Sequence, residues 1–163
     1  MKLPALFLCL LALGSAPAAQ ARDALGVFGA WAAFRDPQVP RCYAIAMPNG
    51  PARQDETAPY ADVGLWPKRG VRGQFHLRLA RRSGGAAPII LSMGRNRWPL
   101  VGGGYDAWAA DNRMDAAIIA AMRSAESFTV TARDAQGRSF SATYALQGAG
   151  TAMDAATVAC AGR

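Results

Sequence analysis

The sequence predicts a mainly β domain with two short helices, folded either as a β-sandwich or as a strongly curved antiparallel sheet. Three observations predict this class. Short apolar segments alternate with polar residues and end at Pro or Gly. Only two segments combine helical spacing with a capping residue. The chain has 163 residues, and the 142 that remain without the first 21 suit a single domain with its own core.

The first 21 residues indicate a secretory signal peptide. Lys2 gives a basic start, apolar residues follow up to Leu13, and small residues stand at Ala19 and Ala21. A membrane anchor is the alternative, but this run is shorter than the roughly 20 apolar residues that a span needs. We expect cleavage after Ala21, a single domain over 22–163, and a periplasmic or secreted location.

The strands are predicted from alternation and from the breaks between them. In "QFHLRLA", Phe75, Leu77 and Leu79 point to one side, while Gln74, His76 and Arg78 point to the other. Prolines and Gly-rich bends separate the strands because they cannot continue a ladder. We expect strands at 27–34, 42–47, 60–66 and 74–80, a hairpin over 88–101, and a second hairpin over 127–146 with a turn at "DAQG".

Two helices are predicted in the second half of the chain. Asn112 is the expected N-cap of the first, with Asp115 in the capping-box position. Its apolar stripe consists of Met114, Ile118 and Met122. Thr151 and Asp154 form the expected capping box of the second helix, which carries Cys160. We expect a core of Phe28, Trp31, Phe75, Leu77, Leu79, Phe128, Val130 and Phe140 packed on the Met114, Ile118 and Met122 stripe.

Three consecutive glycines, Gly102, Gly103 and Gly104, precede the first helix. A phosphate-binding loop would need a Lys followed by Ser or Thr directly at the helix start, and both are missing here. The segment "YDAWAADNR" also separates the glycines from the helix. The triplet therefore predicts a turn or a bulge, where glycine permits positive φ.

The cysteines predict one disulfide. Cys9 leaves with the leader, so the mature chain would keep Cys42 and Cys160. An even pair in an exported chain usually forms a bridge. The bridge would close a ring of about 120 residues, worth about 4–5 kcal/mol by chain entropy. Two buried free thiols are the alternative.

The net positive charge has two interpretations: the protein binds an anionic partner, or its arginines only keep the surface solvated. The formal net charge is +7, and Lys68 is the only Lys after the leader. An exported basic protein meets anionic lipid head groups, lipopolysaccharide and acidic polymers, and Arg binds phosphates well. The predicted contacts lie in "PKRGVRGQFHLRLARR": Lys68, Arg69, Arg72, Arg78, Arg81 and Arg82. Nucleic acid is not expected, because no recognition-module signature is present and export removes the usual targets.

The sequence offers no recognisable catalytic, cofactor or metal site. His76 is the only histidine, and no G-x-S-x-G elbow accompanies it. One His and two distant Cys do not make a closed zinc site, and the aspartates do not match a calcium loop. A carboxylate pair for glycoside cleavage stays open, since the separation of the two groups is set in three dimensions. We therefore expect a non-enzymatic protein without a cofactor or a metal.

The order of elements resembles the invasion-associated locus B family of exported Gram-negative proteins. The residues that carry the likeness are "FGAW" at 28–31, "CYAI" at 42–45, and the helix, hairpin and small-residue helix over 114–156. Relatives commonly carry a cysteine shortly after the tryptophan, where Phe34 and Arg35 stand here. The resemblance implies an exported, β-rich cell-envelope protein, linked in some relatives with host-cell entry. It implies no established enzymatic activity.

A periplasmic hydrolase, or an inhibitor of one, is the alternative. In that case aromatic side chains would line a carbohydrate-type groove. The candidates are Tyr60, Trp66, Trp98, Tyr105 and Trp108. A cleft that gathers two carboxylates, or His76 with an acid, would favour the hydrolase, whereas a flat Arg-rich face would favour the binding protein.

Overall fold

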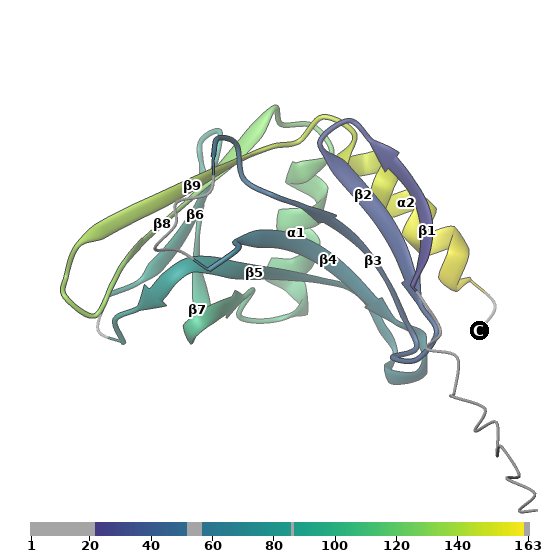
Figure 1. Ribbon diagram of the computed structural model, residues 1–163, viewed down its shortest axis with the longest axis horizontal. Helices are drawn as coiled ribbons and strands as arrows, with labels where there is room; N and C mark the ends of the chain where they lie inside the picture. Colours follow the sequence, from purple (N-terminus) through teal and green to yellow (C-terminus); the bar gives the residue numbers. More distant parts are fainter. Residues whose placement is uncertain (1–21, 52–56, 86, 162–163) are drawn as a thin grey trace, which may run out of the picture.

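The computed structural model describes residues 22–51, 57–85 and 87–161, so the expected leader lies outside the described residues. The described part contains nine strands, two α-helices and one short 3-10 turn (Figure 1). The elements are β1 (Asp23–Phe28), β2 (Trp31–Asp36), β3 (Arg41–Ala46), β4 (Tyr60–Trp66), η1 (Pro67–Arg69), β5 (Val71–Ser83), β6 (Ile89–Met93), β7 (Asn96–Trp108), α1 (Asn112–Met122), β8 (Ser127–Arg133), β9 (Ser139–Ala145) and α2 (Ala149–Cys160).

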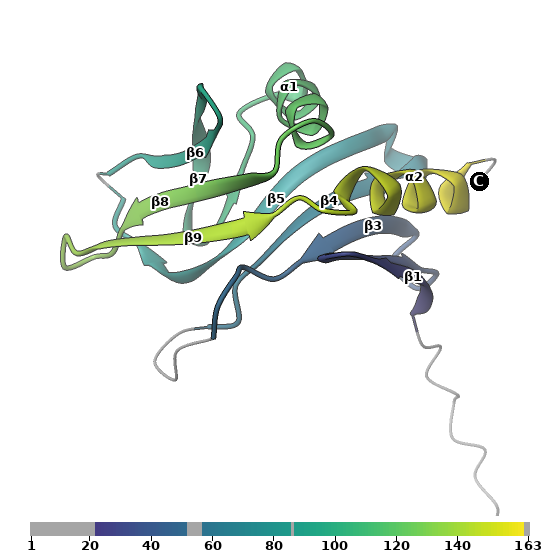
Figure 2. The ribbon, with the colours of Figure 1, turned by 90° about the horizontal axis from the view of Figure 1, so that it is seen from above.

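All nine strands belong to one antiparallel sheet in the order β1-β2-β3-β4-β5-β7-β6-β8-β9. The sheet is open and strongly curved, and Figure 2 shows both helices on the same side of strands β1–β5. The predicted class, mainly β with two helices, is therefore confirmed. Of the two predicted architectures the curved antiparallel sheet is the correct one.

The predicted first strand, 27–34, is in fact two strands. β1 and β2 form a tight hairpin that turns at Gly29 and Ala30. Gly29 has φ of 59°, a left-handed conformation that glycine adopts without a steric penalty. The turn residues are flanked by apolar residues on both sides, so no polar break marks the bend in the sequence.

The Gly triplet lies inside one long strand. The first part of β7 pairs with β6 from Asn96 to Leu100, and the last part pairs with β5 from Gly104 to Trp108. Gly102 lies where the strand changes neighbours, and a Cβ there would come within 2.3 Å of the Asp106 carbonyl oxygen. The glycines thus permit an irregular crossing between two parts of the sheet, which matches the predicted bulge.

Both helices begin differently from the sequence prediction. The N-cap of α1 is Asp111, whose Oδ1 accepts a hydrogen bond from the Met114 N–H at 2.8 Å. The expected cap, Asn112, is the first helical residue. Asp115 forms no capping box: its buried Oδ1 accepts a hydrogen bond from the Phe75 N–H of β5 at 2.7 Å. The carboxylate therefore joins helix to sheet.

The helix α2 starts at Ala149, and its N-cap is Gly148, three residues before the expected cap Thr151. Asp154 makes no cap either, because it pairs with Arg123 at 2.7 Å. The buried side of α2 consists mostly of alanines, Ala149, Ala152 and Ala156. Small side chains allow this helix to approach β1, β2 and β3 closely.

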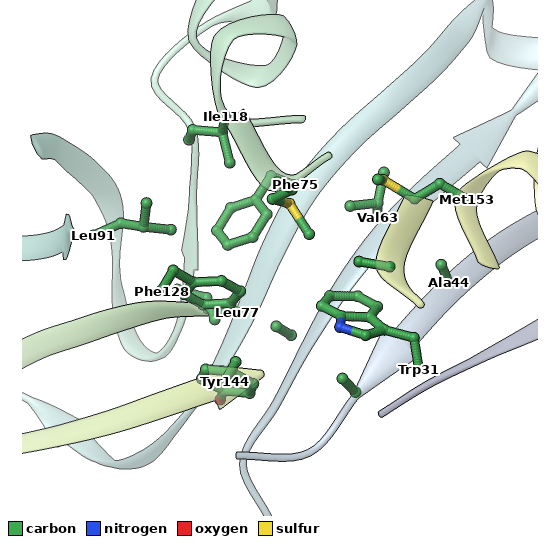
Figure 3. Close-up of a cluster of buried hydrophobic side chains, with 14 of the residues drawn as sticks. Trp31, Ala44, Val63, Phe75, Leu77, Leu91, Ile118, Phe128, Tyr144 and Met153 are labelled. Carbon is green, nitrogen blue, oxygen red and sulfur yellow. The ribbon is translucent and has the colours of Figure 1, made fainter. Parts of the chain in front are cut away.

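The core lies between the sheet and the two helices (Figure 3). Phe128 packs edge-on against Phe75 and stacks on Tyr144. Trp31 is fully buried, and its Nε1 donates to the Ala145 carbonyl at 2.9 Å. Most predicted core residues are buried, whereas Phe28, Met114 and Phe140 are only partly buried at its margin.

Candidate functional site

The sheet face that points away from the helices carries a polar cluster around His76. Register places Asp62 of β4 and Trp108 of β7 on either side of this residue of β5. The Nδ1 atom of His76 lies 2.7 Å from Asp62 Oδ2, and its Nε2 atom lies 3.2 Å from Asp106 Oδ1. Arg78 Nη1 donates to both oxygens of Asp106, at 3.0 and 2.8 Å.

This geometry favours a charged imidazolium. Burial alone lowers the pKa of His76, but the hydrogen bond and charge of Asp62, and then those of Asp106, outweigh it and raise the pKa above its usual value. The imidazolium donates from both ring nitrogens, so it links β4, β5 and β7. The cluster thus cross-links three neighbouring strands.

The same geometry leaves His76 no free nitrogen to act as a general base. Within the described ranges no hydroxyl or thiol is hydrogen-bonded to it. The imidazole fills the space between the two carboxylates, where a glycosidase would need room for a sugar or a water. The carboxylates also lie on opposite sides of the ring and do not converge, and no group of three or more metal-ligating residues among those described could hold a metal ion.

The five aromatic residues predicted to line one groove are divided among four places. Tyr60 and Trp108 flank the His76 ring, with centroids 5.7 and 5.2 Å away. The ring of Trp66 covers Gly64, where a Cβ would lie within 2.4 Å of it. Trp98 packs against the core. Tyr105 lines a hollow of about 270 Å³ together with Arg81 and Arg82, and its ring centroid lies 5.2 Å from the Arg78 guanidinium carbon.

The six predicted cationic contacts are likewise divided along β5. Lys68, Arg69 and Arg72 are exposed at one end of the strand and make no ion pair with any residue that the structure describes. Arg78 lies in the middle, where Asp106 neutralises it. Arg81 and Arg82 lie at the far end, and the guanidinium of Arg81 lies 5.9 Å from the Phe140 ring centroid.

The end with Lys68, Arg69 and Arg72 is also where the disulfide lies. Cys42 of β3 is bonded to Cys160 of α2, with 6.0 Å between the Cα atoms, which confirms the predicted bridge. The turn between β2 and β3, the η1 segment and the last turn of α2 meet there (Figure 1). We call this region the disulfide end.

The disulfide end gathers cations from separate parts of the sequence. Among the residues that the structure describes, the basic ones at this end are Arg22, Arg35, Arg41, Lys68, Arg69 and Arg72, and the carboxylates are Asp23 and Asp36. Asp23 is paired with Arg35, and Asp36 lies 3.3 Å from Arg22 Nε and 4.0 Å from Arg41 Nε. The Val39 N–H lowers the pKa of Asp36 most, burial opposes this, and Arg22 and Arg41 lower it further. Basic groups still outnumber the acidic ones.

Two adjoining hollows open at the disulfide end. One, of about 410 Å³, is lined by Leu65, Pro67, Gly70, Val71, Arg72, Thr157, Cys160 and Ala161. The other, of about 320 Å³, is lined by Arg35, Asp36, Pro37, Pro40, Arg41, Pro67, Lys68 and Cys160. They share Pro67 and Cys160, so they lie on either side of these two residues. We call them the apolar hollow and the basic hollow.

The sequence alone pointed to only part of this region. Lys68, Arg69 and Arg72 were found because they are close in sequence. Arg35 and Arg41 were missed because only the pairing of β2, β3 and β4 brings them beside η1. The partners of His76 were missed for the same reason, although Asp62 and Asp106 both lie in strands of predictable alternation.

The described part of the chain contains no helix that is both long and apolar enough to cross a membrane.

Together these features define the class of the protein: an open antiparallel sheet with two helices on one face and a disulfide that fastens the second helix to the sheet. Among solved structures, the fold is similar to that of invasion associated protein B from Bartonella henselae. The TM-score is 0.61, the likeness covers 86% of this chain and 98% of that one, and the two sequences are 13% identical. At this identity the likeness concerns the fold. No family model and no curated protein matches the chain.

Proposed function

We propose that this chain is an exported, non-enzymatic cell-envelope protein of the invasion-associated type that binds an anionic partner through its disulfide end. The observation that carries the binding proposal is the concentration of Lys68, Arg69 and Arg72 beside Arg35 and Arg41 at one end of the sheet. The fold likeness to invasion associated protein B supports the choice of class.

Export is supported by two independent features. The leader-like first 21 residues predict secretion, and a disulfide persists in oxidising compartments such as the periplasm or the exterior. We therefore propose a periplasmic or secreted location with cleavage after Ala21. An envelope location would expose the basic end to anionic head groups and polymers.

The proposal that the protein is not an enzyme is supported by the contacts of its titratable side chains. His76 bonds to carboxylates through both nitrogens, Asp106 is shared with Arg78, and Asp115 accepts the Phe75 N–H. Each group thus has a structural partner. Tyr60, Trp108 and two acids do gather around His76, as a hydrolase would require, but both imidazole nitrogens are bonded to carboxylates. We therefore prefer the binding protein over the hydrolase.

Co-sedimentation with vesicles tests the proposal. Vesicles of phosphatidylcholine, with and without phosphatidylglycerol, are spun with the mature protein at several salt concentrations. Binding is expected only to the anionic vesicles, and it should weaken as salt rises, because exposed charges are screened within about 8 Å at physiological ionic strength.

A matched pair of variants locates the contact. Lys68→Gln/Arg69→Gln/Arg72→Gln removes three charges from the disulfide end, and Arg95→Gln/Arg97→Gln/Arg113→Gln removes three exposed charges elsewhere. The first should lose about a hundredfold in vesicle affinity, since each basic residue near an anionic surface adds about 1 kcal/mol. The second should keep most of its affinity. Equal losses in both, or no binding at the lowest salt, would overturn the proposal.

A further inference from the structure

The two hollows at the disulfide end suggest a ligand that is both apolar and anionic. The apolar hollow presents Leu65, Val71 and Ala161, with Arg72 at its edge. The basic hollow presents Arg35, Arg41 and Lys68 around three prolines, with Asp36 as its one acidic lining residue. A free inorganic anion would leave the apolar hollow exposed to water, and a neutral hydrocarbon would make no ion pair with the cations of the basic hollow.

The guanidinium of Arg41 is incompletely satisfied. Its Nε is buried and has no hydrogen-bond partner in the described part of the chain, and the nearest carboxylate oxygen, Asp36 Oδ2, is 4.0 Å away. The same guanidinium stacks over the Tyr43 ring, with 4.6 Å to the centroid, which fixes its position. The side chain is 28% exposed, so an anion in the basic hollow could supply hydrogen bonds and charge to this partly buried guanidinium.

The direction of the ligand follows from the electrostatics of α2. The last carbonyls of this helix lie at Cys160 and Ala161, and the partial negative charge at a helix C-terminus repels an anion. The anionic group is therefore better placed beside Lys68 and Arg41 than beside Cys160. The chain of such a ligand would extend past Pro67, which both hollows share, toward Leu65 and Val71.

We propose that the disulfide end binds a single-chain anionic lipid, with its hydrocarbon chain in the apolar hollow and its head group beside Lys68 and Arg41. This inference rests on the proposed function and names the class of its partner. Both hollows fall within the size range of small-molecule sites, about 300–1,000 Å³. Cleavage after Ala21 would add the α-ammonium of Arg22, whose side chain pairs with Asp36, to the same end.

Titration calorimetry with three probes tests the proposal, with the two dodecyl compounds kept below their critical micelle concentrations. Dodecyl phosphate carries both the chain and the charge, dodecylphosphocholine has the chain without net charge, and inorganic phosphate has the charge alone. Dodecyl phosphate should bind at least about tenfold more tightly than either of the others, because only it uses both hollows. Equal affinity for dodecyl phosphate and either control probe would overturn the proposal.

Two pairs of variants locate the ligand. Thr157 is exposed and lines the apolar hollow, so Thr157→Phe should fill it and weaken dodecyl phosphate binding about tenfold, the effect of displacing one or two methylenes. Val158, its neighbour, is 75% exposed and does not line the hollow, so Val158→Phe should change nothing. Lys68→Gln/Arg72→Gln should weaken binding, whereas Arg95→Gln/Arg97→Gln should not. Equal effects within either pair would contradict the proposed site.

The outcomes also separate this inference from the proposed function. If dodecyl phosphate does not bind but phosphatidylglycerol vesicles still sediment the protein, the lipid site is wrong and the anionic surface stands. If dodecyl phosphate binds as described and vesicles do not sediment the protein, the lipid site stands and membrane association fails. The charge variants keep the lipid test valid if Thr157→Phe does not fold.

Discussion

Cys42 and Cys160 join the start of strand β3 to the last turn of helix α2. Their Cα atoms are 6.0 Å apart and their positions are 118 residues apart in sequence. Cys42 lies in register with Leu65, which lines the apolar hollow, and Cys160 itself lines both hollows. The bridge therefore stabilises the fold and also shapes the proposed binding region.

Removing the bridge should cost much of the stability. For Cys42→Ala/Cys160→Ala we expect a loss of about 4–5 kcal/mol, because the unfolded chain regains the entropy of a very long loop. Urea unfolding of this variant and of the wild type, with and without reductant, measures the loss. Wild type with reductant should resemble the variant, and coincident unfolding curves in all four samples would contradict a structural role for the bridge.

The stability contributed by His76 should depend on pH. Because the pKa of His76 is raised in the folded state, the stabilisation is fully present below the unfolded value of about 6.5 and is lost as pH rises through the folded value. A neutral imidazole carries no charge and has a single N–H, so it can donate a hydrogen bond to Asp62 or to Asp106 but not to both.

We expect His76→Gln to be about 1.5–3 kcal/mol less stable than the wild type near pH 6, the range for hydrogen bonds to charged groups. The difference should shrink above the folded pKa of His76. Urea unfolding across the pH range, with the imidazole titration followed by NMR, measures both. A difference that grows with pH would show that the imidazolium is not the stabilising form.

Asp115 should act through its hydrogen bond and not through its charge. Burial raises the pKa of Asp115 most, the Phe75 N–H opposes this, and Asp111 adds to the rise. Asp115→Asn keeps an acceptor for the Phe75 N–H without a buried charge, so its stability should match or exceed that of the wild type. Asp115→Ala leaves the N–H unpaired and should cost about 1–3 kcal/mol. Equal stability of the two variants would refute this account of α1 docking.

Gly148 should be intolerant of a side chain. A Cβ there would lie 1.8 Å from the Phe28 carbonyl oxygen, and the backbone has φ of 84°. Gly137 has a similar φ of 76° but open space around it. A substitution there therefore measures the cost of the left-handed backbone alone, without a steric clash. Gly137→Ala should cost about 1–2 kcal/mol, and Gly148→Ala should cost more than about 4 kcal/mol or prevent folding. Similar thermal midpoints for the two variants would mean that α2 can shift away from the β1–β2 turn.

The sequence predicts those elements whose pattern is local. The alternation in 74–80 and in 127–146 identified β5, β8 and β9. The even number of cysteines expected to remain without the leader predicted the bridge. The turn at Gly29 was missed because its neighbours are apolar. The caps were misplaced because several capping residues stand together before α1, and only the fold assigns Asp115 to Phe75.

The same limit applies to the candidate site. The prediction grouped Lys68, Arg69 and Arg72 because they are neighbours in sequence. It also included Arg78, because only the structure shows that Asp106 already neutralises this side chain. The hollows depend on three segments that meet only through strand register and the disulfide. Concavity of this kind has no sequence pattern.

Hydrogen–deuterium exchange in the presence of dodecyl phosphate tests the central claim most directly. The account predicts slower exchange in the β2–β3 turn, in 66–72 and at the end of α2, with no change in the β6–β7 turn that carries Arg95. Protection confined to the β6–β7 turn or to the far end of β5 around Arg82, with none at the disulfide end, would contradict it.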